Sequence, residues 1–526
     1  MDFPCSKGFQ HNCYSPPLPS VSTGYHRRVI PHRVSPGPKP SQFRRPSAAG
    51  VNGRAFVRSS APQSEDQHPE QQSSLQRGVA EDPWLARTLS SFASLQSSQP
   101  SPWLQQLRDS CQQALQTQRM PTTRNEAFRF TDVSPILKSS FQMSTGTDAV
   151  SSSQVASHPL PDADGARIVL VNGQFAQHLS DTSQIPEGVF LGEVSDAPEE
   201  IASNLGQQAR VRGGPFALVN GATAQQVLCL HVPEGTCLDV PVHILHLSTG
   251  ASGDVSLSSP RTLIKLGPKA MATVVEEFSS PDASAHYFAN AVGEIELGQG
   301  ASLTHRYVQL ENAQAWHMRG TMVRQQAHSV YELTETSLGA SIARHDLNVE
   351  QAGEGTQTVM RSFLLCGDQQ LHDLHSRLTL EHPDGVANQL HKCIVASPSG
   401  RGVFDGNVRV CRLAQKTDAA QLSRNLLLVP RATVNVKPNL QIVADDVKCS
   451  HGCTVSDLEE EQLFYFRARG IDDETARRIL VYSFGSEVTQ YFHSKPLIQR
   501  IQERVAATLA PTVNTILVEP QSVKPA

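Results

Sequence analysis

The sequence predicts a mainly β fold, in which a parallel β-helix or similar solenoid lies between an N-terminal and a C-terminal α-helical segment. Between residues 165 and 455, apolar and polar residues alternate over short runs separated by Gly, Pro, Asn or Asp at intervals of roughly ten residues, which indicates many short strands. Such a run is long for a single sandwich, whereas stacked coils each bury an inward face against the next coil. Two packed sandwiches are the alternative.

A loose repeat supports stacked coils. It reads "LGPKA" at 266–270, "LGQGA" at 297–301 and "LVPRA" at 428–432, and each copy follows one predicted strand and opens the next. The repeat is too degenerate to fix a period.

Residues 81–138 read as an N-terminal helical segment. "DPWLARTLSSFASL" and "SPWLQQLRDSCQQALQ" each begin with Asp or Ser ahead of a Pro at the first helical position, which satisfies free amides at a helix start. "MPTTRNEAFRFTDVSPIL" follows. Residues 139–164 are Ser-rich and weakly patterned, so they predict a linker or exposed loop.

Residues 456–510 predict a C-terminal helical domain, followed by a tail at 511–526. Ser456 and Glu459 have the spacing of a capping box, and Gly470 provides a stop for that helix. A second helix starts near Asp472 and a third at Pro496. The second carries apolar residues four apart, which share one helical face: Leu480, Phe484, Val488 and Phe492. This face predicts either packing on the end of the β body or a docking surface for another protein.

The first sixty residues predict an organelle transit peptide, with residues 61–80 as a linker. They contain nine Lys or Arg, nine Ser, nine Pro and a single acid, and no continuous apolar core of a secretory signal. The proline density favours the plastid (chloroplast stroma) over the mitochondrion, and a disordered basic tail is the alternative. No apolar run reaches the length of a membrane-spanning helix.

Charge and motifs exclude several classes of protein. The leader carries a net charge of +8 and the whole chain one of -5, so the remainder of the chain carries a net charge of -13. Such a negative protein is a poor match for the negatively charged backbone of a nucleic acid. The chain has no Gly-Lys dipeptide and therefore no phosphate-binding loop, so another chain must bind ATP if ATP is used. The eight cysteines beyond the leader are expected to be reduced, and most of them buried.

The stretch "KCSHGC" is the strongest candidate site. Cys449, His451 and Cys453 alternate, so on a strand all three point to one face unless Gly452 interrupts it. A closed structural zinc site needs four ligands, and no partner pair occurs elsewhere. Three interpretations stay open: a redox or nucleophilic cysteine, buried structural residues, or half of a metal site completed by another subunit. Asp445 and Asp446 either orient His451 or are solvated turn residues.

A second cluster, "LHDLHSRLTLEH", is expected to be structural or surface-exposed. His372 and His375 are three residues apart, which places them on opposite faces of a strand and argues against a shared metal. The other members of the cluster are Asp373, His382 and His391.

Several of these stretches resemble a known family. "KTDAAQLSRNLLL", "VKPNLQIVADDVKCSHGCTV" and "EEEQLFYFRARGI" resemble SufD, the scaffold subunit of the SUF iron-sulfur cluster assembly complex, and "MPTTRNEAFRFTDVSPIL" resembles its N-terminal segment. The resemblance implies a right-handed parallel β-helix core flanked by helices and a chain that is not an enzyme. It also implies pairing with a SufB-like scaffold through the β-helix ends, and C-terminal helices that receive a SufC-like ATPase.

The resemblance also implies site residues. By position, Cys449 and His451 become candidate metal ligands for an iron-sulfur cluster (iron and sulfide) held transiently and shared with the partner subunit, with no ATP site in this chain. Cys453 stands where the family usually has alanine, so it is either a third ligand or a tolerated small residue. Gln441 replaces a usual carboxylate. The predicted ATPase-binding residues are Leu480, Phe484, Val488 and Phe492.

Two other functions fit the residues. One is a β-helix enzyme acting on polysaccharide, although no paired acids stand out in the sequence. The other is a purely architectural subunit without metal contact.

Overall fold

Two parallel β-sheets form the body of the computed structural model, which describes residues 82–93, 100–143, 146–250 and 255–518. The predicted transit peptide and the linker at 61–80 lie outside these residues. The first sheet (sheet A) comprises, in spatial order, β4 (Phe190–Glu193), β5 (Leu228–Val232), β8 (Arg261–Leu266), β10 (Tyr287–Leu297), β12 (Trp316–Gln325), β14 (Ile342–Gln351), β16 (Leu371–Leu380), β18 (Arg401–Val410) and β20 (Thr433–Ile442). Beside this path, β1 (Phe141–Met143) pairs with β7 (Val255–Ser258), and β7 pairs with β10.

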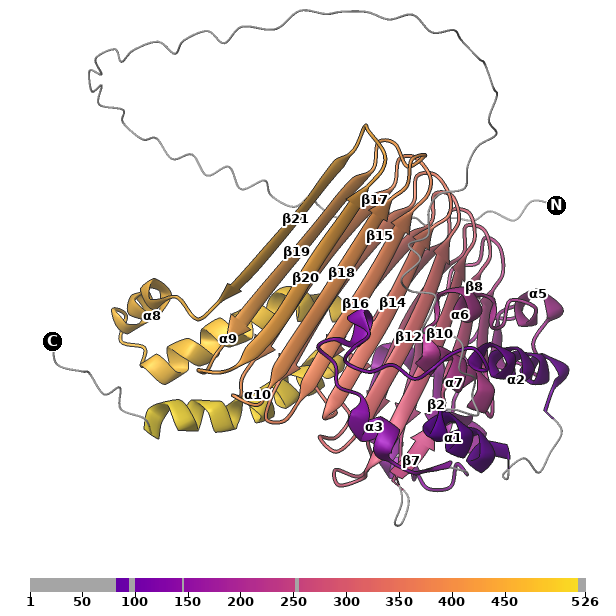
Figure 1. Cartoon of the computed structure of the whole chain (residues 1–526), viewed down its shortest axis with the longest axis horizontal. Helices are drawn as coiled ribbons and strands as arrows, with labels where there is room; N and C mark the ends of the chain where they lie inside the picture. The colour runs from indigo at the N-terminus through magenta and orange to yellow at the C-terminus, as the bar shows by residue number, and fades with distance from the viewer. Residues whose placement is uncertain (1–81, 94–99, 144–145, 251–254, 519–526) are drawn as a thin grey trace, which may run out of the picture. The chain divides into compact units, whose positions relative to one another are not determined.

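The second sheet (sheet B) takes the strands that alternate with these along the chain. Its spatial order is β3 (Gln174–Phe175), β2 (Arg167–Val171), β6 (Val242–Leu247), β9 (Met271–Ser279), β11 (Ser302–Gln309), β13 (Val330–Ser337), β15 (Gln357–Cys366), β17 (Val386–Val395), β19 (Asp418–Leu427) and β21 (Lys448–Ser456). The chain therefore winds as a solenoid from the coil β5–β6 to the coil β20–β21 (Figure 1). This confirms the predicted parallel β-helix core.

The two ends of the solenoid differ. At the first end, β4 runs antiparallel to β5 and β3 antiparallel to β2, so short strands close both sheets. At the other end, within the described part of the chain, β20 pairs only with β18 and β21 only with β19. We call the coil formed by β20 and β21 the open end.

The turns between sheets explain the weak repeat. Each connection from sheet A to sheet B, from β8–β9 to β18–β19, holds one residue in the left-handed region at φ between 57° and 67°, at intervals of 27 to 32 residues: Lys269, Gly300, His328, Gly355, Asp384 and Lys416. Glycine adopts this conformation without steric cost, but here four of the six are other residues. The turn geometry repeats while its sequence does not.

An N-terminal layer covers the outer face of sheet A (Figure 1). Its helices are α1 (Pro83–Ala93), α2 (Pro102–Leu115), α3 (Ser134–Lys138) and the short η3 (Glu126–Phe128). Asp82 and Ser101 accept hydrogen bonds from amides of the first turns of α1 and α2, as predicted. Trp84 and Phe216 pack with Phe288 of β10 beneath them.

Two parts of the sequence prediction were wrong in this region. The stretch read as uninterrupted strands contains α5 (Glu199–Ala202), α6 (Gln207–Arg212) and α7 (Pro215–Thr223). Helix α7 is buried on all sides, so its sequence has no amphipathic pattern. The predicted linker at 139–164 contains β1, α4 (Ser152–Ala156) and η4 (Pro161–Ala163), and it buries Val155 and Leu160.

The C-terminal helices are α8 (Glu460–Arg467), α9 (Asp473–Thr489), η6 (Gln490–Phe492) and α10 (Lys495–Val518). Helices α9 and α10 lie against the outer face of sheet B, and not on the end of the β body as predicted, while α8 contacts α9. Helices α9 and α10 pack on apolar residues of β9, β11 and β15, and Arg500 of α10 makes two hydrogen bonds of 3.0 and 2.7 Å to the buried Glu277 carboxylate. Among the described residues, the flank of the solenoid is covered and the open end is not.

The start of α8 also corrects the sequence prediction. Strand β21 continues to Ser456, which pairs with Leu426 of β19, and Glu459 is the residue before α8 without a side-chain cap. The predicted capping box does not form because its serine belongs to the sheet. Asp472 does cap α9, through the Thr475 amide.

We expect the fit of α9 on sheet B to be sensitive at Gly485. A Cβ atom added there lies 2.9 Å from the Phe363 ring of β15, closer than real Cβ contacts. Gly485→Leu is therefore expected to lower the free energy of unfolding by about 1–3 kcal/mol through overpacking. Urea unfolding followed by circular dichroism measures it. Ser483→Leu, on the exposed side of α9, is the matched control and should change stability little.

Candidate functional site

The "KCSHGC" residues form the last strand of sheet B. β21 pairs with β19 in register from Lys448 to Ser456, and the strand runs through Gly452 without a break. Cys449, His451 and Cys453 face the same side as their partners on β19, which are buried within the solenoid: Ala419, Gln421 and Ser423. The predicted shared face is therefore present in the fold.

These three side chains differ in exposure. Cys449 is half-buried and packs against the apolar core of the solenoid, whereas His451 and Cys453 are exposed. His451 lines a small cavity with Gln421 of β19 and Leu440 of β20. The site thus lies where the interior of the solenoid reaches the surface at the open end.

Burial changes the acidity of both thiols. Loss of solvation raises the pKa of Cys449, and the nearby Asp418 carboxylate raises it further, against a backbone hydrogen bond that lowers it. Loss of solvation also raises the pKa of Cys453. Both thiols are therefore protonated at neutral pH in this chain alone.

Strand geometry separates the three positions. Residues two apart on a strand lie about 7 Å apart, and residues four apart about 13 Å. Cys449 and His451 are neighbours on the inner face, whereas Cys449 and Cys453 are at opposite ends of the triplet. Within the described residues, no group of three or more His, Cys, Asp or Glu side chains is arranged to hold a metal ion.

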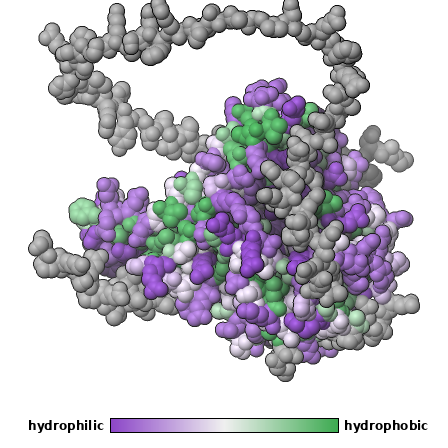
Figure 2. Space-filling model, in the orientation of Figure 1, coloured by the Kyte–Doolittle hydropathy of each residue, from purple (hydrophilic) through white to green (hydrophobic). Residues whose placement is uncertain are grey.

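The open end also exposes apolar side chains and strand edges. Ile442, Val443 and Val455 have 45%, 49% and 50% of their surface exposed. Figure 2 shows hydrophobic patches over this part of the β body. An edge strand with unpaired backbone groups and apolar neighbours is a ready surface for pairing with another chain.

The neighbouring polar residues do not complete the site. Asp445 and Asp446 are exposed in the turn between β20 and β21, and in the described structure neither forms a hydrogen bond or ion pair with His451. Their interpretation as solvated turn residues fits this position. Gln441 lies on the outer face of β20, opposite Arg409 of β18, and is exposed.

The second histidine cluster is dispersed. His372 points into the solenoid, while His375 points outward to Asp373 at 3.1 Å, which confirms the predicted opposite faces. His391 stacks on Phe404 and bonds to Ser362, and burial lowers its pKa to about 3. His382 follows β16 at the surface.

The predicted ATPase-binding face of α9 is largely occupied by the chain itself. Val488 and Phe492 are buried against sheet B, with Phe484 packed beside them and Leu480 half-buried, because this face holds α9 on the solenoid. The exposed apolar residues of this region were missed in the sequence. They are Phe464 (67%), Tyr465 (54%), Ile479 (41%) and Tyr482 (45%), which we call the helical patch. The three-residue spacing of Ile479 and Tyr482 on α9 is the sequence feature from which this shared exposed face could have been predicted.

The fold and the site define a class of protein: a parallel β-solenoid, flanked by helices, that presents cysteine and histidine at an uncovered end. The SufBD protein N-terminal region matches residues 89–244, and the SufBD core domain of SUF system FeS cluster assembly matches residues 247–484. The chain belongs to the SufBD family of the SUF iron-sulfur cluster assembly system.

Curated relatives agree with this assignment. "Protein ABCI7, chloroplastic" of Arabidopsis thaliana is 41% identical over 437 residues, which is 81% of this chain and 91% of the relative. An iron-sulfur cluster assembly SufBD family protein of Synechocystis is 34% identical over 74% of this chain and 87% of its own length. Iron-sulfur cluster assembly protein SufD of Escherichia coli is 31% identical over 77% and 92%.

The eight described cysteines are all free thiols. Four of the eight are buried, whereas the sequence predicted that most of them would be. Among the described thiols, we expect iodoacetamide at about pH 8 to modify the exposed Cys237 first, then Cys453, and Cys449 several-fold more slowly than Cys237. Partial cover and a raised pKa both reduce the reactive thiolate of Cys449. Peptide mass spectrometry over time measures the order. Equal rates at Cys449 and Cys237 would contradict the described burial.

Proposed function

We propose that this chain is a SufD-like, non-catalytic scaffold subunit of a complex with a SufB-like scaffold and a SufC-like ATPase. Its open end joins the SufB-like partner, and Cys449 and His451 contribute ligands to an iron-sulfur cluster built transiently at that junction. The position of these two side chains at the only uncapped end among the described coils carries the proposal. Family membership favours this role over a polysaccharide-acting enzyme.

The open end suits end-to-end pairing of two solenoids. β20 and β21 offer two long strand edges, and a partner strand added to each continues both sheets. The apolar residues Val436 and Leu440 of β20 are only partly buried beside the core, so a partner coil removes apolar surface from water as well. Hydrogen bonds fix the register and apolar burial supplies affinity.

The ligand set follows from strand geometry. Thiolate and imidazole are suitable donors for iron in iron-sulfur chemistry, and Cys449 and His451 are adjacent on the inner face. Cys453 is too far along the strand to bind the same iron as Cys449. We assign Cys453 to a position beside the cluster and the remaining ligands to the partner subunit.

The helical patch is the proposed docking surface for the ATPase, in place of the buried face of α9. Phe464 and Tyr465 lie on α8, Ile479 and Tyr482 lie on α9, and these two helices contact each other. Large exposed aromatic side chains are the residue type that most often anchors a protein interface. Arg467 and Arg469 beside the patch provide charge for a polar rim.

The proposed location is the plastid. The Arg-rich, Ser-rich, acid-poor leader and the chloroplastic relative from Arabidopsis support it. Among the described helices, none is long and apolar enough to cross a membrane.

Substituting both proposed ligands should separate assembly from cluster content. In Cys449→Ala/His451→Ala, the complex with SufB-like and SufC-like partners is expected to assemble, while iron and sulfide per complex fall by about tenfold or more, because two donors are removed from the cluster. Iron and sulfide analysis of the co-expressed, anaerobically purified complex measures this.

The matched control is Cys237→Ala/His178→Ala, which removes an exposed thiol and an exposed imidazole near the first coils. It should leave iron and sulfide unchanged. Normal cluster content in the Cys449/His451 double variant refutes the ligand role and leaves a purely architectural subunit.

Truncating the helical patch should release the ATPase. Phe464→Ala/Tyr482→Ala is expected to weaken binding of the SufC-like ATPase by about tenfold or more, since large aromatic anchors dominate interface energy. Co-purification and titration calorimetry measure it. Leu413→Ala, an equally exposed residue in the turn between β18 and β19, is the control. Unchanged ATPase binding by the double variant would move the docking surface elsewhere.

A further inference from the structure

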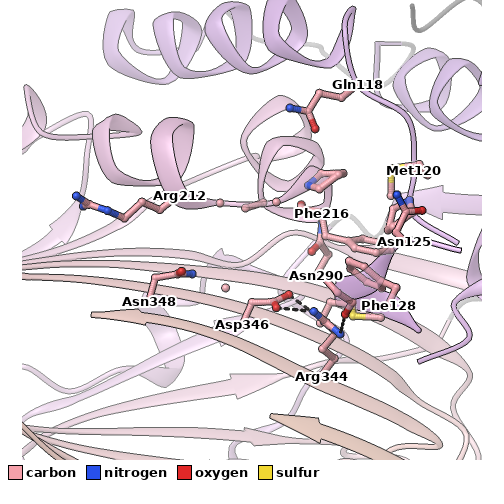
Figure 3. A pocket seen from close by; sticks show the side chains of 18 of the residues that line it. Gln118, Met120, Asn125, Phe128, Arg212, Phe216, Asn290, Arg344, Asp346 and Asn348 are labelled. Carbon is pink, nitrogen blue, oxygen red and sulfur yellow. Dashed lines mark hydrogen bonds and ion pairs between the residues drawn. The ribbon is translucent and has the colours of Figure 1, made fainter. Parts of the chain in front are cut away.

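A cavity of about 630 Å³ lies on the outer face of sheet A, away from the open end and the helical patch. Residues 117–128 of the N-terminal segment and the start of α7 enclose it against β10, β12, β14 and β16. In Figure 3, Arg344, Asp346 and Asn348 rise from the strands, and Gln118 and Asn125 lie across the cavity from them. Its volume is that of a small-molecule site.

One part of the cavity wall is apolar. Met318 and Met322 of β12, Phe216 of α7 and Phe128 of the N-terminal segment are buried side chains that line it. Gly320 lies between the two methionines, and a Cβ atom there has only ordinary contacts, at 3.8 Å to Ala217, Met322 and Val292. Such a wall suits a flat apolar or aromatic ring system.

The charge of the lining is strongly one-sided. Six arginines line the cavity, against a single carboxylate, Asp346. Arg344 already bonds to Asp346 at 2.7 Å and to Asp373 at 2.6 Å, and Arg319 bonds to Glu276 inside the solenoid. Arg124 and Arg377 have no ion pair among the described residues. Arg212 pairs with Glu350. In a chain whose net charge is negative, two guanidinium groups at one cavity, without a carboxylate partner in the described part of the chain, form an anion-binding feature.

Two further features of the cavity favour a ligand. Helix α7, nine residues long, follows Gly214, which provides no side-chain cap. Pro215 has no N–H and the Ala217 amide donates to the Gly214 carbonyl, so the amides of Gly214 and Phe216 are the donors left at this helix start within the described structure. Asn348 is only 8% exposed, yet its side-chain amide forms no hydrogen bond within the described structure. This amide reaches the cavity and is available to bond to a ligand there.

We propose that this cavity binds a small organic anion: an aromatic or otherwise flat apolar body that carries a phosphate, sulfonate or carboxylate group. The body rests on Phe216, Phe128 and Met318. The acidic group accepts hydrogen bonds from Arg377, from Asn348 beside it in the sheet, and from the Gly214 and Phe216 amides at the start of α7. This site goes beyond the proposed scaffold function and does not depend on it.

The test uses the full chain and the fluorescent aromatic anion anilinonaphthalene sulfonate as the probe, with pyrophosphate as the competing anion. Saturable binding is expected, with displacement by pyrophosphate. Arg377→Ala, an exposed residue whose loss should not impair folding, is expected to weaken probe binding by about tenfold, the value of one charge-assisted hydrogen bond. Gly320→Leu, which fills the apolar wall, should weaken it at least as much.

Arg409→Ala is the matched control, because Arg409 is an exposed arginine on the same face of sheet A, on β18, outside the cavity lining. It should leave binding unchanged. Probe affinity unaffected by both Arg377→Ala and Gly320→Leu overturns the proposal. Affinity lowered by Gly320→Leu but insensitive to Arg377→Ala and to pyrophosphate overturns the anion preference, and with it the assigned ligand class.

Discussion

Backbone hydrogen bonding between coils is the constraint on which the rest of this structure depends. In a parallel solenoid every strand donates and accepts toward the coil before it and the coil after it, so the two terminal coils are left with unpaired groups. At the first coil, the antiparallel strands β3 and β4 pair with β2 and β5 and so supply partners for backbone groups of that coil. At the last coil, β20 and β21 pair on one side within the described structure. The thiol and imidazole of β21 therefore lie where the fold leaves strand edges for a partner to pair with.

The flanking layers explain why the helices do not cover that end. The outer faces of both sheets carry apolar side chains, and these are buried only if the N-terminal layer and the C-terminal helices lie along the flanks. Two ion pairs, each with one buried partner, hold the second layer in place: Arg500 pairs with the buried Glu277, and the exposed Glu487 pairs with the buried Lys392. Helix α9 uses its apolar face for this contact, so a protein partner has to use the residues on its other side.

The sequence predicted the structural elements that depend on local residue patterns, and it missed the elements that depend on tertiary packing. Alternation predicted the strands, and the spacing of Cys449 and His451 correctly predicted a shared face. Helix α7 was missed because it is buried all round, and the coil period was hidden because Lys269 and Lys416 occupy turn positions that elsewhere hold glycine. The arginine-lined cavity joins residues from four strands and two distant segments, so no single stretch of sequence predicts it.

Burial and pairing act together at the open end. Desolvation raises the pKa of Cys449, so the thiol of the isolated chain stays protonated and is a weak nucleophile and a weak ligand. A metal cation next to the sulfur reverses this balance, because it favours the thiolate far more than burial opposes it. On the proposed function, a partner coil that adds to β21 brings its own donors and the metal to the same face of the strand. The Cys449 thiol then becomes a ligand only when the two sheets are continued, which ties cluster assembly to subunit assembly.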